Sequence, residues 1–103
     1  MAAKQAAEKL ISEHLVAIFS KSYCPYCSQA KSVIAKLGLD PAKVGILELD
    51  NMGSEGSDIQ AYLAEKTSQR TVPNIFINQK HLGGCSDLLN AQSQGKLDQL
   101  LKA

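Results

Sequence analysis

The sequence predicts an α/β fold, in which helices cover a sheet that contains parallel strands, and three observations support this class. Leu15 to Phe19 is an unbroken apolar run, as expected of a strand covered on both faces. An amphipathic helical pattern follows from about Pro25 to Leu37, and Val44 to Asp50 reads as a second strand. A strand, a helix and a strand in this order form a right-handed crossover with parallel strands. The carboxyl ends of both strands then share one edge of the sheet, where such sheets bind ligands.

Further helices are expected before and after this unit. Ala3 to His14 is rich in good helix formers and predicts a packing helix. The glycine- and serine-rich segment 51–57 is expected to be a loop, with Ser54 or Ser57 as the N-cap of a third helix. That helix is expected to end near Thr67.

The last third of the chain predicts a hairpin and two helices. Residues 71–84 read as two short strands joined at Asn78-Gln79, because asparagine tolerates the left-handed conformation of a tight turn. Gly83-Gly84 allows the backbone to turn before Ser86-Asp87, which can cap a fourth helix. Residues 97–101 predict a short terminal helix.

The composition excludes several classes of function. The chain of 103 residues has a formal charge of +1 and 5% aromatic residues, so it offers no concentrated basic face for nucleic acid. Its longest apolar run, at 15–19, is far shorter than the roughly twenty residues of a membrane-spanning helix. Glu8 and Glu13 argue against a transit peptide, and no signal-peptide pattern precedes them. We expect one soluble domain over residues 1–103 that binds neither nucleic acid nor membranes.

Cys24 and Cys27 form the clearest chemical motif in the chain. They follow the buried strand directly, and Pro25 suits the first position of a helix, where its missing N–H costs nothing. Cys24 then lies at the helix cap with its sulfur open to the unpaired amides, and Cys27 lies one turn inside. A helix N-terminus beside Lys21 favours a thiolate. The pair therefore predicts a redox site.

Zinc binding is the main alternative for a Cys-X-X-Cys pair. A structural zinc site needs four ligands, and Cys85, His14 and His81 do not form a second close pair. We therefore expect no metal. Three cysteines are also too few, and odd in number, for the disulfide framework of a secreted domain, so a reducing, cytoplasmic location is expected.

Three segments together resemble a dithiol glutaredoxin of the Cys-Pro-Tyr-Cys class: Lys21-Ser22-Tyr23-Cys24-Pro25-Tyr26-Cys27, Thr71-Val72-Pro73 and Gly83-Gly84-Cys85-Ser86-Asp87. Thioredoxins usually carry Cys-Gly-Pro-Cys after a tryptophan, and this chain has no tryptophan. The resemblance covers nearly the whole chain. It implies a thioredoxin fold, with a central four-stranded mixed β-sheet flanked by about five helices. It also implies a cis bond between Val72 and Pro73.

The resemblance implies a glutathione-dependent thiol-disulfide oxidoreductase with Cys24 and Cys27 as its catalytic residues. Glutathione is the expected reducing co-substrate, and its two carboxylates and one ammonium need partners. The amides of Cys85 and Ser86, at a predicted helix N-terminus, suit one carboxylate. Asp87 suits the ammonium, although capping alone is its alternative role. The full set of expected glutathione-binding residues is Lys21, Tyr26, Gln60, Arg70, Thr71, Val72, Pro73, Gly84, Cys85, Ser86 and Asp87.

Two modes of reaction are expected. Cys24 alone reduces protein-glutathione mixed disulfides, whereas protein disulfides also need Cys27. Glutathionylated or disulfide-bonded proteins are the expected clients, and glutathione reductase acts indirectly through the glutathione pool. The alternative is a dimer that holds a [2Fe-2S] cluster with Cys24 and glutathione. Pro25 argues against it, since cluster-holding relatives often have a small residue there, and we expect a monomer.

Overall fold

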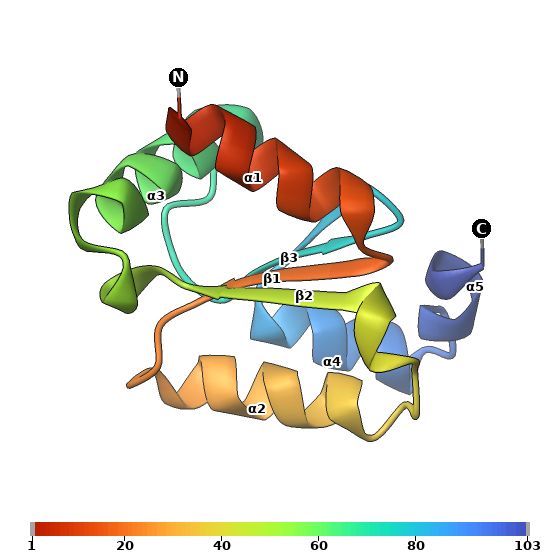
Figure 1. The fold of residues 1–103 in the computed structure, drawn as a ribbon. Helices are drawn as coiled ribbons and strands as arrows, with labels where there is room; N and C mark the ends of the chain where they lie inside the picture. Colours follow the sequence, from red (N-terminus) through yellow and green to blue (C-terminus); the bar gives the residue numbers. More distant parts are fainter. Residues whose placement is uncertain (1, 103) are drawn as a thin grey trace.

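A four-stranded mixed sheet forms the centre of the molecule, and the computed structural model describes residues 2–102 (Figure 1). The strands lie in the order β2-β1-β3-β4. Strand β1 pairs in parallel with β2 and antiparallel with β3, which pairs antiparallel with β4. The thioredoxin-like sheet and the parallel crossover predicted from the sequence are confirmed. The strands are β1 (Val16–Ser20), β2 (Val44–Glu48), β3 (Asn74–Ile77) and β4 (Lys80–Gly83).

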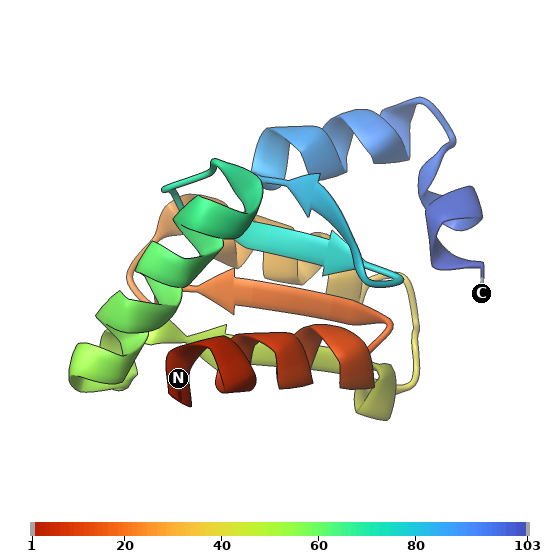
Figure 2. The same cartoon turned by 90° about the horizontal axis from the view of Figure 1, so that it is seen from above.

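Helices cover both faces of this sheet. Figures 1 and 2 show α1 and α3 on one face and α2 and α4 on the other. In the described part of the chain, the α-helices are α1 (Ala2–Glu13), α2 (Pro25–Ala35), α3 (Gly53–Thr67), α4 (Cys85–Ser93) and α5 (Leu97–Leu101). Short 3-10 turns, η1 (Pro41–Lys43) and η2 (Leu49–Asn51), flank β2. Met1 and Ala103, the two ends of the expected domain, lie outside the described residues.

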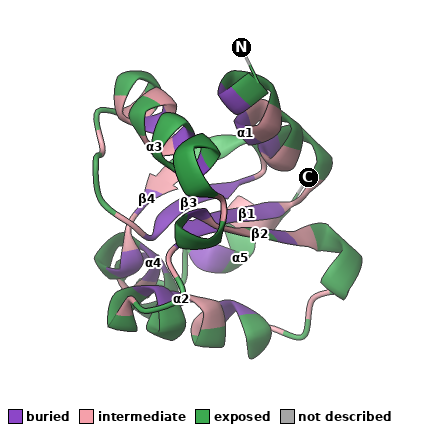
Figure 3. Cartoon of the chain, turned by 60° about the vertical axis from the view of Figure 1, so that its left-hand side comes forward, coloured by how far each residue is buried: buried purple, intermediate pink, exposed green. Residues whose placement is uncertain are grey.

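The position of strand β1 in the fold explains why its sequence shows no polar alternation. All five of its residues are buried, because each face of the strand packs against a different pair of helices (Figure 3). Ala17 and Phe19 join the core under α1 and α3. Val16 and Ile18 join the core over α2 and α4. The strand therefore runs through the middle of the molecule and ends at the cysteine turn.

The segment 51–57 does not form the loop that was predicted. Helix α3 begins at Gly53, and Ser54 and Ser57 lie inside it, so neither provides the N-cap. The glycines misled the prediction because one of them serves packing. Gly56 is buried, and a Cβ atom there would clash with the carbonyl oxygen of Leu49. The helix can pack against η2 only because this position lacks a side chain.

The hairpin between β3 and β4 is confirmed. Asn78 and Gln79 adopt left-handed conformations, with φ of 55° and 68°. The Asn78 N–H donates to the carbonyl of Leu15 over 2.8 Å, which ties the turn to the start of β1. Helix α3 ends at Thr67 and α5 spans the predicted residues. Across residues 2–102, no helix has the length and apolarity needed to cross a membrane.

Candidate active site

The cysteine turn joins the end of β1 to the start of α2. Cys24 occupies the N-cap position with extended backbone angles, φ −87° and ψ 120°, and Pro25 follows as the first helical residue. Within residues 2–102 no side chain caps this helix end. The Cys24 N–H donates to the Lys21 carbonyl over 3.1 Å, which closes the turn. The N-cap position predicted for Cys24 is therefore confirmed.

The two thiols of this turn differ in burial and in pKa. Cys24 is partly exposed, whereas Cys27 is fully buried. Desolvation opposes the Cys24 thiolate, but hydrogen bonds from the N–H and thiol of Cys27 and from the Tyr26 N–H outweigh it and lower the Cys24 pKa. Burial raises the pKa of Cys27, and the neighbouring Cys24 raises it further. Cys24 is therefore the more acidic and more accessible of the two thiols, and Cys27 is the shielded one.

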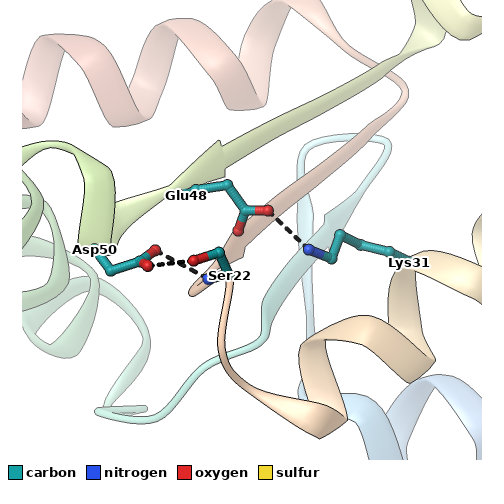
Figure 4. A network of polar contacts seen from close by, with 4 residues as sticks. All are labelled: Ser22, Lys31, Glu48 and Asp50. Atoms are coloured by element: carbon teal, nitrogen blue, oxygen red, sulfur yellow. Dashed lines mark hydrogen bonds and ion pairs between the residues drawn. The ribbon is translucent and has the colours of Figure 1, made fainter.

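Lys31 is a cation near Cys24 that the sequence analysis did not predict. The positive charge of Lys31 contributes to the lowered pKa of Cys24. Lys31 lies two turns along α2, and its Nζ atom pairs with Glu48 Oε2 over 2.7 Å (Figure 4). Lys21 instead lowers the pKa of Asp50 as one of several contributors. Lys31 can act on Cys24 because residues seven apart on a helix lie on one face.

A second polar contact fixes the approach to the cysteines. Asp50 accepts a hydrogen bond from the Ser22 N–H over 2.9 Å, and its other oxygen accepts one from the Ser22 hydroxyl (Figure 4). The hydroxyl bond, followed by the N–H bond, lowers the pKa of Asp50. This contact links the active-site loop to η2. No local pattern predicted this contact, because the two residues are 28 positions apart.

The segment before β3 forms one wall of the site. The Val72-Pro73 peptide bond is cis, as the resemblance implied. The Cys24 thiol donates to the Val72 carbonyl over 3.9 Å, so this wall lies directly against the reactive sulfur. The side-chain amide of Gln69 donates to the carbonyls of Thr71 and Pro73, over 3.1 and 3.0 Å. Gln69 thus holds the backbone on both sides of Val72, a role that the sequence analysis missed.

The start of α4 forms the opposite wall. Gly84 is its N-cap, and Asp87 Oδ2 accepts a hydrogen bond from the Gly84 N–H over 2.9 Å. Of the predicted pair of caps, only Asp87 acts, and Ser86 lies inside the first turn. The N–H groups of Cys85 and Ser86 belong to the first turn, which has no intrahelical acceptors for them. Cys85 itself is buried, and burial raises its pKa.

A pocket lies between these walls. Seven of the eleven expected glutathione-binding residues line it, together with Gln29 and Leu89, which were not predicted. Gln60 and Arg70 instead line a separate depression, where the Gln60 amide donates to the Arg70 carbonyl over 2.8 Å. The expected residues outside the pocket lining are Lys21, Gln60, Arg70 and Asp87, and those in the lining are Tyr26, Thr71, Val72, Pro73, Gly84, Cys85 and Ser86.

The two histidines considered as zinc ligands, His14 and His81, make other contacts in the structure. His81 Nε2 lies 2.9 Å from Asn74 Oδ1 and 3.2 Å from Gln69 Oε1, and burial lowers its pKa. His14 Nδ1 lies 2.9 Å from the carbonyl oxygen of Leu10, in its own helix. Over the described residues, no group of three or more histidine, cysteine, aspartate or glutamate side chains is placed to hold a metal ion.

Comparison with known proteins gives the family. The family model described as "Glutaredoxin" matches residues 16–82, a span that contains both the cysteine turn and the Val72-Pro73 wall. The chain belongs to the glutaredoxin family. It is 53% identical to "Glutaredoxin-1" of Rhizophagus irregularis over 100 residues, which cover 97% of this chain and 95% of that protein.

Further members of the family agree with this assignment. "Glutaredoxin-C2" of Arabidopsis thaliana is 48% identical, over 96% of this chain and 86% of its own length. Among solved structures, a buckwheat glutaredoxin-glutathione complex is similar, with 42% identity and a TM-score of 0.88, over 97% of this chain and 87% of that one. The glutaredoxin fold expected from the resemblance is confirmed.

Proposed function

We propose that this member of the glutaredoxin family is a glutathione-dependent thiol-disulfide oxidoreductase, formed by one domain over residues 1–103. The observation that carries the proposal is the asymmetry of the cysteine pair. Cys24 is accessible and has a lowered pKa, and Cys27 is buried with a raised one. An attacking thiolate needs the first environment, and a resolving thiol that must not react with solvent needs the second.

In the first route Cys24 acts alone. Its thiolate attacks the glutathione sulfur of a protein-glutathione mixed disulfide. A disulfide forms between Cys24 and glutathione, and the protein leaves as a thiolate that takes a proton from water. The thiolate of a second glutathione then attacks the glutathione sulfur, which releases oxidised glutathione and restores the Cys24 thiolate. No electron acceptor other than the disulfide is needed.

In the second route both cysteines take part. The Cys24 thiolate attacks one sulfur of a client disulfide, so the client S–S bond breaks, the first client sulfur leaves as a thiolate, and a mixed disulfide forms between Cys24 and the client. Cys27 loses its proton to solvent and attacks Cys24, which forms the Cys24–Cys27 disulfide and releases the second client thiol. Two glutathione molecules then reduce this disulfide. Cys27 lies one turn inside α2, so its sulfur reaches Cys24 without approaching the client.

Glutathione occupies the pocket between the two walls in this proposal. The backbone of Val72 pairs with its cysteine residue, because an extended peptide pairs with free backbone groups. The amides of Cys85 and Ser86 take one carboxylate at the N-terminus of α4. Asp87 uses Oδ2 for the Gly84 N–H, which leaves Oδ1 for the ammonium. The remaining contacts are Lys21, Gln60 and Arg70 for the glycine carboxylate, with Tyr26, Thr71, Pro73 and Gly84 along the groove.

The partners follow from this chemistry. Glutathionylated and disulfide-bonded proteins are the clients, and glutathione reductase acts through the glutathione pool. The protein works as a monomer in a reducing compartment such as the cytoplasm. The [2Fe-2S] alternative is not favoured, since Pro25 stands directly after Cys24 and the pair has the asymmetry of an attacking and a resolving thiol.

The test is reduction of a glutathionylated peptide by glutathione, coupled to glutathione reductase and NADPH. The wild-type protein should accelerate NADPH oxidation, and Cys24→Ser should not exceed the rate without enzyme. A Cys24→Ser protein as active as the wild type would overturn the proposal.

A further inference from the structure

Ser20 is a buried polar residue with no role in either proposed route of reaction. It is the last residue of β1, four positions before Cys24, and its side chain is fully buried. Among the described residues, its hydroxyl has no hydrogen-bond partner. An unpartnered buried hydroxyl costs stability, so its presence calls for a reason.

The alternation of β1 places this hydroxyl under the cysteine turn. Side chains two apart on a strand share a face, so Ser20 points to the same side as Val16 and Ile18. Those two residues pack in one core with Ala30 and Ile34 of α2. Cys27 is buried one helical turn before Ala30, on the same inward face of α2. The Ser20 hydroxyl and the Cys27 thiol therefore both lie in the layer between β1 and α2.

The charges around Cys27 support this assignment. Burial raises the pKa of Cys27 and Cys24 raises it further, whereas the Lys21 N–H and, to a smaller extent, the Ser20 hydroxyl lower it. The other charged groups on this face are Lys31 of α2 and Glu48 of β2, which pair with each other. Lys31 acts on Cys24. The third thiol of the site, Cys85, follows on α4 with its pKa raised by burial.

We propose that Ser20 is a positioning residue for the dithiol route, whose hydroxyl donates a hydrogen bond to the Cys27 thiolate as it forms. The inference rests on the proposed function and specifies its second route. When a client is bound to Cys24, Cys27 loses its proton to solvent inside a site that disfavours charge. The hydroxyl stabilises that thiolate while it attacks the Cys24 sulfur, the disulfide forms, and the client sulfur leaves. The first route never generates a Cys27 thiolate, so it does not need Ser20.

A second buried oxygen provides the competing assignment. Glu48 Oε1 also has no donor in the described part of the chain, and Glu48 is paired with Ser20 in the register of β1 and β2. Lys31 pairs with the other oxygen of Glu48, Oε2, over 2.7 Å, so the charge of Glu48 is compensated without Ser20, and the cysteine gains more from the hydroxyl. The two assignments predict different results when Ser20 is changed.

The first experiment titrates Cys27 directly. In a Cys24→Ser, Cys85→Ser background Cys27 is the only thiol of the chain, since the sequence has three cysteines. Thiolate absorbance in the ultraviolet is followed against pH with Ser20, with Ser20→Ala and with Ser20→Thr. Ser20→Ala should raise the pKa of Cys27, and Ser20→Thr, which keeps the hydroxyl, should restore it. An unchanged pKa in Ser20→Ala would overturn the proposal and assign the hydroxyl to Glu48.

The second experiment separates the two routes in the otherwise wild-type protein. Ser20→Ala should slow reduction of a protein disulfide about three- to tenfold, because the thiolate fraction falls more than its nucleophilicity rises. Its optimum should move to higher pH, and reduction of a glutathionylated peptide should stay within about twofold of the wild type. Loss of both activities to the same degree would contradict the role of Ser20 while leaving the proposed function in place. Cys24→Ser tests the proposed function itself, since this variant should lose both activities.

Stability measurements exclude a merely structural role. Because the hydroxyl is unpartnered in the reduced protein, Ser20→Ala should not lower the melting temperature of the reduced enzyme. A large drop in melting temperature, with the activities falling together, would contradict the proposal.

Discussion

The N-termini of α2 and α4 lie at the same edge of the sheet, yet the pKa of the cysteine at each one is shifted in opposite directions. Strands β1 and β4 run in the same direction, so the helices that follow them begin side by side. Cys24 is the N-cap of α2, and its pKa is lowered. Cys85 is the first residue of α4, and its pKa is raised because it is buried.

The difference shows that a helix N-terminus alone does not activate a thiol. In α2 the sulfur occupies the cap position, where it is partly exposed and accepts hydrogen bonds from the first turn. In α4 the capping role belongs to the Asp87 carboxylate, and the cysteine beside it is packed into the core. One terminus therefore carries the more acidic thiol, and the other is a fixed wall that can receive the anion of a substrate.

The largest expected effect comes from removing the active thiolate. Cys24→Ser should lower turnover by at least about a thousandfold on both glutathionylated and disulfide substrates, because a serine hydroxyl remains protonated at neutral pH. The coupled NADPH assay measures it. If Cys85 supplied the turnover instead, the variant would stay active, and the comparison between the two helix ends would be reversed.

The next effect separates the two cysteines of α2. Cys27→Ser should keep reduction of a glutathionylated peptide, because that route uses Cys24 alone. It should lose protein-disulfide reduction by about tenfold or more, since the mixed disulfide with the client is no longer resolved from within. Parallel assays on one preparation give the ratio. Equal loss on both substrates would contradict the division of roles.

Alkylation tests the two helix ends directly. At neutral pH iodoacetamide should modify Cys24 about ten- to a hundredfold faster than Cys85, because only the thiolate reacts. As pH falls through the lowered pKa of Cys24, protonation should slow its alkylation. Cys85 should react appreciably only at higher pH. Mass spectrometry of the digested protein gives both rates, and equal rates would remove the contrast.

Lys31 and Lys21 form a matched pair of cation variants. Lys31→Gln should raise the pKa of Cys24, so that less thiolate is present at neutral pH and turnover falls about two- to threefold, an effect kept small by solvent screening. Lys21→Gln should shift the pKa less, since Lys21 acts on Asp50. Thiol titration of both variants shows which lysine has the larger effect on the pKa of Cys24. A larger shift for Lys21→Gln would restore the assignment made from the sequence.

The smallest effect concerns the capped helix. Asp87→Ala removes the acceptor of the Gly84 N–H and should destabilise the protein by about 1 kcal/mol, or roughly 4–8 °C in melting temperature. Asp87→Asn keeps an oxygen acceptor and should lose less. Thermal unfolding of both variants measures the cap, and equal melting temperatures for all three proteins would show that it contributes nothing.

Short-range patterns predicted much of this molecule from the sequence. The unbroken run of β1, the hairpin turn at Asn78 and the cap position of Cys24 each depend on residues a few positions apart. The prediction of a loop over segment 51–57 was wrong because glycine was taken as a sign of a loop. Gly56 is instead required by contact with η2, which local sequence does not reveal.

The parts of the site that the sequence analysis missed depend on contacts that form only in the folded backbone. Lys31 acts on Cys24 from two turns along α2, and Gln69 holds the wall at Val72 through carbonyls of its own loop. Ser22 meets Asp50 only because β1 and β2 are neighbours. No pattern in the sequence pointed to Lys31, Gln69 or Asp50 as supports of the site.

The central claim is that the thiolate at the N-terminus of α2 takes glutathione from the client. The direct measurement mixes Cys27→Ser with an excess of glutathionylated peptide, without free glutathione, and identifies the modified residue by mass spectrometry. The account predicts one glutathione on Cys24 for each peptide released as a free thiol. Peptide release without an adduct on Cys24, or an adduct on Cys85 instead, would contradict it.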